Sequence, residues 1–297
     1  MKKNGHQSFA QAVLSDYLRG FLKERDDVRS GKDIEALHRM RVASRRLRSA
    51  LRVFEDVFYP KKINKWRKRV RKIGRTLGVA RELDIQIRFI DLVKDKVKDR
   101  GNRKGLKELR EDLKKQRRAV QKKIVAVLDS PATKKKLSSL RSHLKDLLKK
   151  KEEGAWDVLR PKCEELVLAH LDDLLSYEPF VHSPEKVQEL HQMRIAAKNL
   201  RYTLEILESF YGKGFKKFST AARAIQDVLG DLHEYDVWLF SLPCVAAQHQ
   251  NNPDFKKAVS YLEEKCGLLR AVTYKKFVRI WENLEKIKIW RELRKAI

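Results

Sequence analysis

One histidine and three cations recur with the same spacing at two places in the sequence. The segment HRMRVASRRLRSAL at 38–51 returns 153 positions later as HQMRIAAKNLRYTL at 191–204. The first copy contains His38, Arg41, Arg45 and Arg48, and the second contains His191, Arg194, Lys198 and Arg201. Steps of three, four and three residues place each set on one face of a helix. Because like charges on one helix face repel, each strip indicates that the protein binds a polyanion, which would neutralise the strip.

Each strip borders an apolar face. In the first copy a separate stripe repeats at helical spacing, with the members Leu37, Met40, Ser44, Leu47, Leu51, Phe54 and Phe58. At roughly 100° per residue, the basic strip lies about a quarter turn from the centre of this stripe. We therefore expect the cations at the margin of a core. His38 and His191 have two interpretations, a packed core residue or an imidazole facing phosphate. Metal ligation is disfavoured because the neighbouring side chains are cations.

The next helix supplies further cations. Lys65 and Arg71 match Lys217 and Arg223 of the second copy, and the first copy alone also carries Lys61, Lys62, Lys68, Arg69, Lys72 and Arg75. A groove or pore lined by both copies would focus positive potential and bind a linear polyanion. Arginine suits that role because its planar fork can bind two phosphate oxygens at once.

Two carboxylates stand at equivalent places, in GVARELD at 78–84 and GDLHEYD at 230–236. We expect a helix to begin near each motif, where Asp84 and Asp236 would act as caps and offset the helix dipole. Alternatively, they hold Arg41 and Arg194 in position. Magnesium chelation has weak support, since each copy offers one aspartate amid positive charge. No metal, cofactor or catalytic residue is predicted.

Charge is distributed unequally over the 297 residues. The formal net charge is +28, with 36% charged and 42% hydrophobic residues. Residues 1–150 hold 45 basic and 18 acidic side chains, whereas residues 151–297 hold 23 and 22. Such asymmetry indicates an anionic partner for the first half, which could be nucleic acid, anionic lipid or another polyanion.

Three cysteines, Cys163, Cys244 and Cys266, lie far apart without metal-ligand spacing, so neither a disulfide framework nor a zinc site is expected. The sequence contains no apolar run of signal-peptide or membrane-spanning length. We expect a soluble, cytoplasmic protein without membrane contact.

The similarity between the copies extends beyond the basic segment. Residues 61–87 match 212–239 once one position is skipped, and RAVQKKIVAVL at 118–128 resembles RAVTYKKFVRI at 270–280. We interpret residues 7–297 as one all-α domain made of two repeats, at about 7–150 and about 155–297. Each repeat is predicted to be an antiparallel helical bundle, with approximate two-fold symmetry between the repeats and a basic cavity along or between them.

The predicted helices of the first repeat are 7–29, 33–58, 61–78, 82–98, 104–129 and 132–150. Those of the second are 155–176, 184–211, 214–230, 233–250 and 254–296. Glycine and proline define most of the ends. Gly78 ends one helix, and Ser183 and Pro184 open another as N-cap and first residue.

The repeated pattern H-x-x-R-x-x-x-[RK]-x-x-R, followed each time by L-G-x-x-[RH]-[DE]-x-D, resembles the CHAD family, the conserved histidine α-helical domain. The resemblance covers about residues 7–297. It implies two similar helical bundles flanking a basic cavity, binding of inorganic polyphosphate, association with polyphosphate granules and contact with phosphate-metabolising enzymes. The family's histidine corresponds to His38 and His191. Its basic positions correspond to Arg41, Arg45, Arg48, Arg194, Lys198 and Arg201. In the second copy Asn199 replaces the cation at Arg46.

Three functions follow from these observations. The first is non-catalytic polyphosphate binding. The second is nonspecific nucleic-acid binding at low salt, although the basic strips offer almost no aromatic side chain for base stacking except Tyr202. The third is a phosphotransferase or polyphosphatase that uses His38 or His191.

Overall fold

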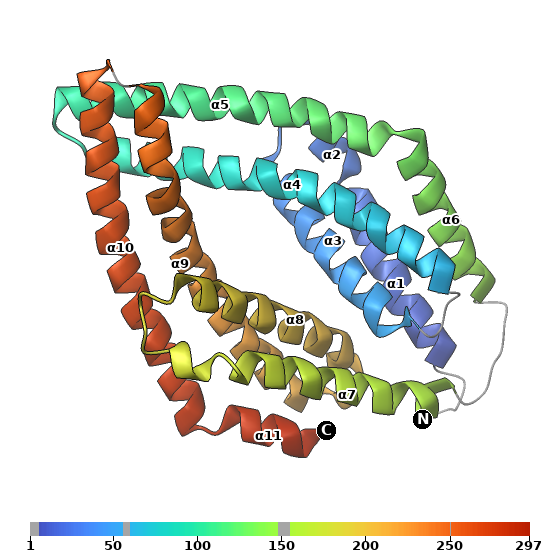
Figure 1. Ribbon diagram of the computed structural model, residues 1–297. Helices are drawn as coiled ribbons and strands as arrows, with labels where there is room; N and C mark the ends of the chain where they lie inside the picture. The colour runs from blue at the N-terminus through green and yellow to red at the C-terminus, as the bar shows by residue number, and fades with distance from the viewer. Residues whose placement is uncertain (1–5, 56–59, 148–154, 250) are drawn as a thin grey trace. The chain divides into compact units, whose positions relative to one another are not determined.

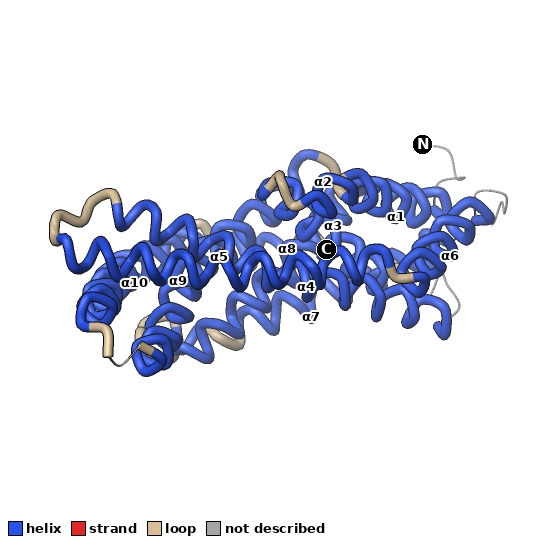
Figure 2. Tube along the Cα trace, turned by 90° about the horizontal axis from the view of Figure 1, so that it is seen from above, coloured by secondary structure: helices blue, strands red, loops and turns tan. Residues whose placement is uncertain are grey.

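The computed structural model describes residues 6–55, 60–147, 155–249 and 251–297. Within these ranges the chain forms helices joined by short loops and turns and contains no strand (Figures 1 and 2). The all-α prediction is therefore confirmed. The predicted helix ends at 58, 150 and 250, and Phe58 of the apolar stripe, lie outside the described residues.

The first of two compact units comprises Met1–Asp95 and Arg110–Lys162. Its helices are α1 (His6–Lys23), α2 (Arg25–Ser30), α3 (Ile34–Val53), α4 (Pro60–Lys94), the second part of α5 (Arg100–Asp129) and α6 (Pro131–Leu147). α3 packs against both α1 and α4, and α6 contacts α1 and α4 (Figure 1). Apolar side chains such as Leu14, Leu47 and Leu77 are completely buried between these helices.

The second unit comprises Lys96–Leu109 and Cys163–Ile297. It contains the start of α5, most of α7 (Ala155–Leu175), η2 (Glu178–Phe180), α8 (Val187–Tyr211), η3 (Lys213–Phe215), α9 (Lys216–Gln248), α10 (Pro253–Lys286) and α11 (Ile289–Ala296). α9 packs against α8 on one side and α10 on another. Met193, Leu200 and Phe277 are completely buried in its core.

Two predicted helix ends are wrong. α4 runs without interruption through Gly78, and α9 runs through Gly230. A helical glycine costs only about 1 kcal/mol relative to alanine. Buried leucines flank each glycine, for example Leu77 and Leu229, so burial of the continuous apolar face outweighs that cost.

Other predicted boundaries also need correction. α8 begins at Val187 and not at Pro184, because Ser183 and Pro184 belong to the preceding turn. The predicted helix 7–29 is divided between α1 and α2. The predicted helix 254–296 is divided at Lys288, whose φ of 53° is left-handed and ends the regular helix.

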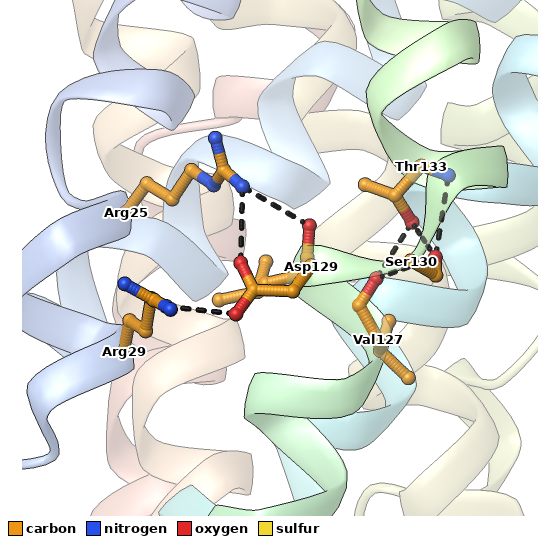
Figure 3. Close-up of polar contacts among 7 residues, drawn as sticks. Arg25, Arg29, Val127, Asp129, Ser130 and Thr133 are labelled. Carbon is orange, nitrogen blue, oxygen red and sulfur yellow. Dashed lines mark hydrogen bonds and ion pairs between the residues drawn. The ribbon is translucent and has the colours of Figure 1, made fainter.

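Side-chain contacts fix the short α2 and the turn into α6. Asp129, the last residue of α5, accepts hydrogen bonds from Arg25 at 3.2 Å and from Arg29 at 2.8 Å (Figure 3). Ser130 follows and caps α6, since its Oγ accepts a hydrogen bond from the backbone N–H of Thr133 at 3.3 Å. These contacts hold α2 directly before the turn that leads into α3.

None of the described helices is long and apolar enough to span a bilayer.

Candidate anion-binding site

The first basic strip lies along α3 at the edge of the buried face, as predicted. His38, Arg41, Arg45 and Arg48 are all half-buried, whereas Leu37, Met40 and Leu47 of the same helix are buried. Asp33 caps the helix by accepting the backbone N–H of Glu35 at 2.8 Å. The strip is therefore partly desolvated, which strengthens the field of its cations.

Arg48 lies among further arginines of α3 and α4. Burial lowers the pKa of its guanidinium, and nearby positive charges lower it further. In order of effect these charges belong to Arg71, Arg45, Arg67 and Arg75. We call these four residues and Arg48 the arginine cluster. It brings together three predicted site residues, Arg45, Arg48 and Arg71.

The arginine cluster has few internal counter-ions. Arg67 pairs with Glu55 at 2.9 Å. Among the described residues, the other four members form no salt bridge. Neighbouring guanidinium groups without carboxylates repel one another, and phosphate oxygens would neutralise them while accepting paired N–H donors. The arrangement is that of an anion-binding surface.

A close approach of α3 and α4 supports this surface. A Cβ atom at Gly74 of α4 would lie 2.9 Å from the Oγ of the buried Ser44. Ser44 satisfies its own hydroxyl by donating a hydrogen bond to the carbonyl oxygen of Arg41 at 2.7 Å. The small residues at this crossing allow the basic faces of the two helices to adjoin.

His38 adjoins Arg81 of α4. Burial lowers the pKa of His38, the charge of Arg81 lowers it further, and Glu35 opposes the shift. Arg81 itself lies 3.8 Å from the Glu35 carboxylate. The imidazole is therefore neutral at neutral pH unless an added anion favours its protonated form.

Lys65 does not join the arginine cluster. It is exposed on α4, and at roughly 100° per residue it lies about 120° around the helix from Arg71. Its counterpart Lys217 on α9 forms an ion pair with Glu292 of α11 at 2.5 Å. The positions of Lys65 and Lys217 therefore do not support the predicted role of these lysines in anion binding.

The predicted cap role of Asp84 and Asp236 is wrong, because both residues lie inside continuous helices. Asp84 accepts a hydrogen bond from Arg117 Nε of α5 at 2.8 Å, and its side chain is 5% exposed. Asp236 accepts one from Arg270 Nε of α10 at 2.5 Å. The carboxylates thus hold Arg117 and Arg270, and not Arg41 and Arg194 as the alternative interpretation expected.

Both arginines extend these contacts to the segment that precedes a basic helix, which is α2 in the first unit and a turn in the second. Arg117 Nη1 donates to Gln121 Oε1 at 2.9 Å, and Gln121 Nε2 donates to the carbonyl oxygen of Val28 at 2.8 Å. In the second unit, Arg270 donates directly to the carbonyl oxygen of Pro184 at 2.8 Å. The aspartates are therefore linked to α2, which precedes α3, through Arg117 and Gln121, and to the turn before α8 through Arg270.

His191 of the second strip, on α8, pairs with a histidine of α9. His191 Nδ1 lies 3.2 Å from His233 Nδ1 of α9, with ring centroids 4.2 Å apart. Burial, the charge of Arg194 and the proximity of His191 lower the pKa of His233 to about 4. Burial, Arg194 and Lys198 lower the pKa of His191, and Asp236 opposes them. Both rings are therefore largely neutral at neutral pH.

Arg201 and Arg223 converge on one carboxylate. Arg201 Nε donates to Glu205 Oε1 at 2.8 Å, and Arg223 Nη2 donates to the same oxygen at 3.0 Å. The side chains of Glu205 and Arg201 are only 7% and 11% exposed. Asp227 lies 3.6 Å from Arg201 Nη1. Unlike the arginine cluster, this end of the second strip is neutralised within its own unit.

Several of these residues are not among the predicted site residues. Arg67 lies in a lysine-rich run, and Glu205 lies outside both repeated motifs. Arg81 and His233 occupy the variable [RH] position of the repeated motif, which could have identified them. Arg117 was missed because the repeat comparison pairs Arg270 with Arg118, one position away from its structural counterpart.

Comparisons with known proteins agree with this fold. The sequence profile of the CHAD domain matches residues 12–242. The crystal structure of the CHAD domain from the plant Ricinus communis superposes with a TM-score of 0.72 at 22% identity, covering 94% of this chain and 93% of that one. PptA from Streptomyces chartreusis also gives 0.72, at 14% identity, over 93% and 99% of the two chains. No curated protein matched significantly.

An all-helical chain with repeated histidine–arginine strips and this profile match falls into one class of protein. The chain belongs to the CHAD domain family.

Proposed function

We propose that this protein binds inorganic polyphosphate without chemically altering it. The observation that carries the proposal is the arginine cluster, in which the charges of Arg45, Arg71 and Arg75 act on the half-buried Arg48 and, among the described residues, these four form no salt bridge. A linear chain of phosphates offers an oxygen acceptor at every unit and could neutralise several guanidinium groups together. Family membership implies the same class of ligand.

The chemistry of the arginine side chains supports binding without catalysis. Guanidinium groups hold phosphate but stay protonated, so they neither attack phosphorus nor accept a proton. Phosphate release after incubation of the protein with polyphosphate and magnesium would contradict this part of the proposal and would favour a polyphosphatase using His38 or His191.

Nucleic acid is the alternative ligand, since a net charge of +28 attracts any polyanion at low salt. Tyr202 was the one aromatic residue beside a basic strip, and it is only 4% exposed. Trp66 of α4 is 2% exposed. Neither ring is available to stack on a base, so neither provides the platform that single-stranded nucleic acid requires.

A competition experiment tests the proposal. Labelled long-chain polyphosphate is bound to the protein at about 0.15 M salt and is challenged with unlabelled polyphosphate, single-stranded RNA or duplex DNA of equal phosphate content. Polyphosphate is expected to displace the label at far lower concentration than either nucleic acid. Equal competition by all three polymers would contradict the proposal and indicate a generic cationic surface.

Three further expectations stay predictions. The first is that the domain consists of two repeats with a basic cavity along or between them. The second is a cytoplasmic location at polyphosphate granules, and the third is association with phosphate-metabolising enzymes.

A further inference from the structure

Equivalent positions of the two basic strips have opposite charge. Arg48 and Arg201 stand at the same place in the repeated segment, and four residues later the first copy has Arg52 where the second has Glu205. The following helix shows the same reversal. Four residues after the matched pair Arg71 and Arg223, the first copy has Arg75 and the second has Asp227.

These charge reversals determine which charges lie near Arg48 and near Arg201. The charges that most affect Arg48 are those of four arginines, all positive. Near Arg201 lie two carboxylates, Glu205 at 2.8 Å and Asp227 at 3.6 Å, and one further arginine, Arg223, which shares Glu205. The second strip therefore contains its own counter-ions.

The position of Glu205 resembles that of a bound anion. One of its oxygens accepts hydrogen bonds from two guanidinium groups, those of Arg201 and Arg223, on two different helices. A phosphate oxygen bridging Arg48 and Arg71 in the first unit would make the same pair of charge-assisted contacts. Glu205 is also nearly buried, so a phosphate would have to displace a desolvated and fully engaged carboxylate to reach Arg201.

We infer that Glu205, supported by Asp227, occupies the anion position of the second strip as a built-in substitute for phosphate, so that only the first strip binds an oligophosphate. This inference rests on the proposed function and restricts it. One chain has one oligophosphate site, in the arginine cluster, although its basic motif occurs twice.

Calorimetric titration with tripolyphosphate tests the inference through stoichiometry. The wild-type chain is expected to bind one tripolyphosphate. Glu205→Gln combined with Asp227→Asn preserves the shape and most hydrogen bonds of the pair while removing both negative charges. This variant is expected to bind two. The control, Glu189→Gln with Glu264→Gln, removes the same charge from α8 and α10 of the same unit, away from Arg201, and should still bind one.

The reciprocal change provides a second test. Arg52→Glu places a carboxylate four residues after Arg48, the spacing by which Glu205 reaches Arg201. It should weaken tripolyphosphate binding at the first strip at least tenfold. Lys123→Glu, the same charge reversal at an exposed α5 position of this unit, should weaken it much less.

The outcomes separate the two claims. Two equivalent sites in the wild type would overturn the inference. One site in the Glu205→Gln, Asp227→Asn variant, together with equal effects of Arg52→Glu and Lys123→Glu, would also overturn it. Either result would leave the proposed function intact. A wild-type chain that binds neither tripolyphosphate nor long-chain polyphosphate would overturn the proposed function itself.

Discussion

At the scale of single residues, the buried aspartates have a structural role. Asp84 is 5% exposed and pairs with Arg117, which is 14% exposed. Asp84→Ala leaves that guanidinium without its carboxylate, and removing one partner of such a buried pair costs about 3 kcal/mol of unfolding free energy. Urea denaturation measures the loss. Glu111→Ala, which breaks exposed ion pairs in the same unit, should cost less than about 1 kcal/mol. Equal losses would show that the Asp84 pair contributes no more than a surface contact.

The histidine pair predicts a pH dependence of stability. The pKa of His233 is about 4 in the folded protein, below the value of about 6.5 expected in the unfolded chain. The unfolded state therefore binds the proton more tightly, so this histidine's contribution to stability is fully present above about pH 6.5 and is lost as the pH falls towards 4.

Melting temperatures at pH 7 and pH 5 test this prediction. The wild-type melting temperature should fall more between the two values than that of His233→Gln, which cannot take up the proton. His182→Gln, at an exposed position of the same unit, should behave like the wild type. Parallel falls for all three proteins would mean that burial of His233 does not oppose its protonation.

The sequence allowed the residues of the first strip to be predicted, because repeat spacing and helical periodicity together identify one face of α3. It did not allow the partners of Asp84 or Arg223 to be predicted. Asp84 meets Arg117 across 33 positions, and Arg223 meets Glu205 across 18. Such pairings depend on which helix faces adjoin after folding, and periodicity within one helix does not contain that information.

At the scale of helices, two glycines of the second unit differ in the space available for a side chain. A Cβ atom at Gly105 of α5 would lie 2.5 Å from the carbonyl oxygen of Asp254 and 2.6 Å from the Cβ atom of Ala258, both in α10. A Cβ atom at Gly230 of α9 would meet nothing within 4 Å.

Alanine substitutions should therefore change stability in opposite directions. Gly105→Ala forces α5 and α10 apart and should lower the free energy of unfolding by about 1–3 kcal/mol. Gly230→Ala removes a flexible residue from a continuous helix and should raise it by up to about 1 kcal/mol. Chemical denaturation of the two variants measures both changes. A stabilising Gly105→Ala would contradict the close α5–α10 contact, and a destabilising Gly230→Ala would contradict the uninterrupted α9.

The helix ends show where sequence signals were insufficient. Glycine predicted stops at Gly78 and Gly230, but the local cost of one glycine is small against the apolar area that α4 and α9 bury as single helices. The caps that the chain uses were not obvious either. Asp33 caps α3, whereas Ser183, which has a favourable cap residue type, lies in a turn before α8. Helix existence was predictable where a segment is strongly amphipathic, as α5 is, and tertiary packing determined the ends.

At the scale of the whole molecule, net charge and local charge describe different properties. Residues 1–150 carry nearly all the excess positive charge, so they dominate long-range attraction of any polyanion. The structure shows the same inequality at short range. The arginine cluster has little internal neutralisation, while Glu205 and Asp227 together offset the charges of Arg201 and Arg223. A site, and not total charge, should therefore determine tight binding.

The most direct test of this central claim compares two variants with equal charge loss in the first unit. Arg45→Ala with Arg48→Ala and Arg71→Ala removes the centre of the arginine cluster. Lys115→Ala with Lys122→Ala and Lys123→Ala removes three exposed cations of α5. Affinity for long-chain polyphosphate is measured for both at about 0.15 M salt. Because each charge-assisted contact contributes about 1.5–3 kcal/mol, the arginine variant should bind at least about 100-fold more weakly, and the lysine variant less than about tenfold. Equal losses of affinity would contradict the claim.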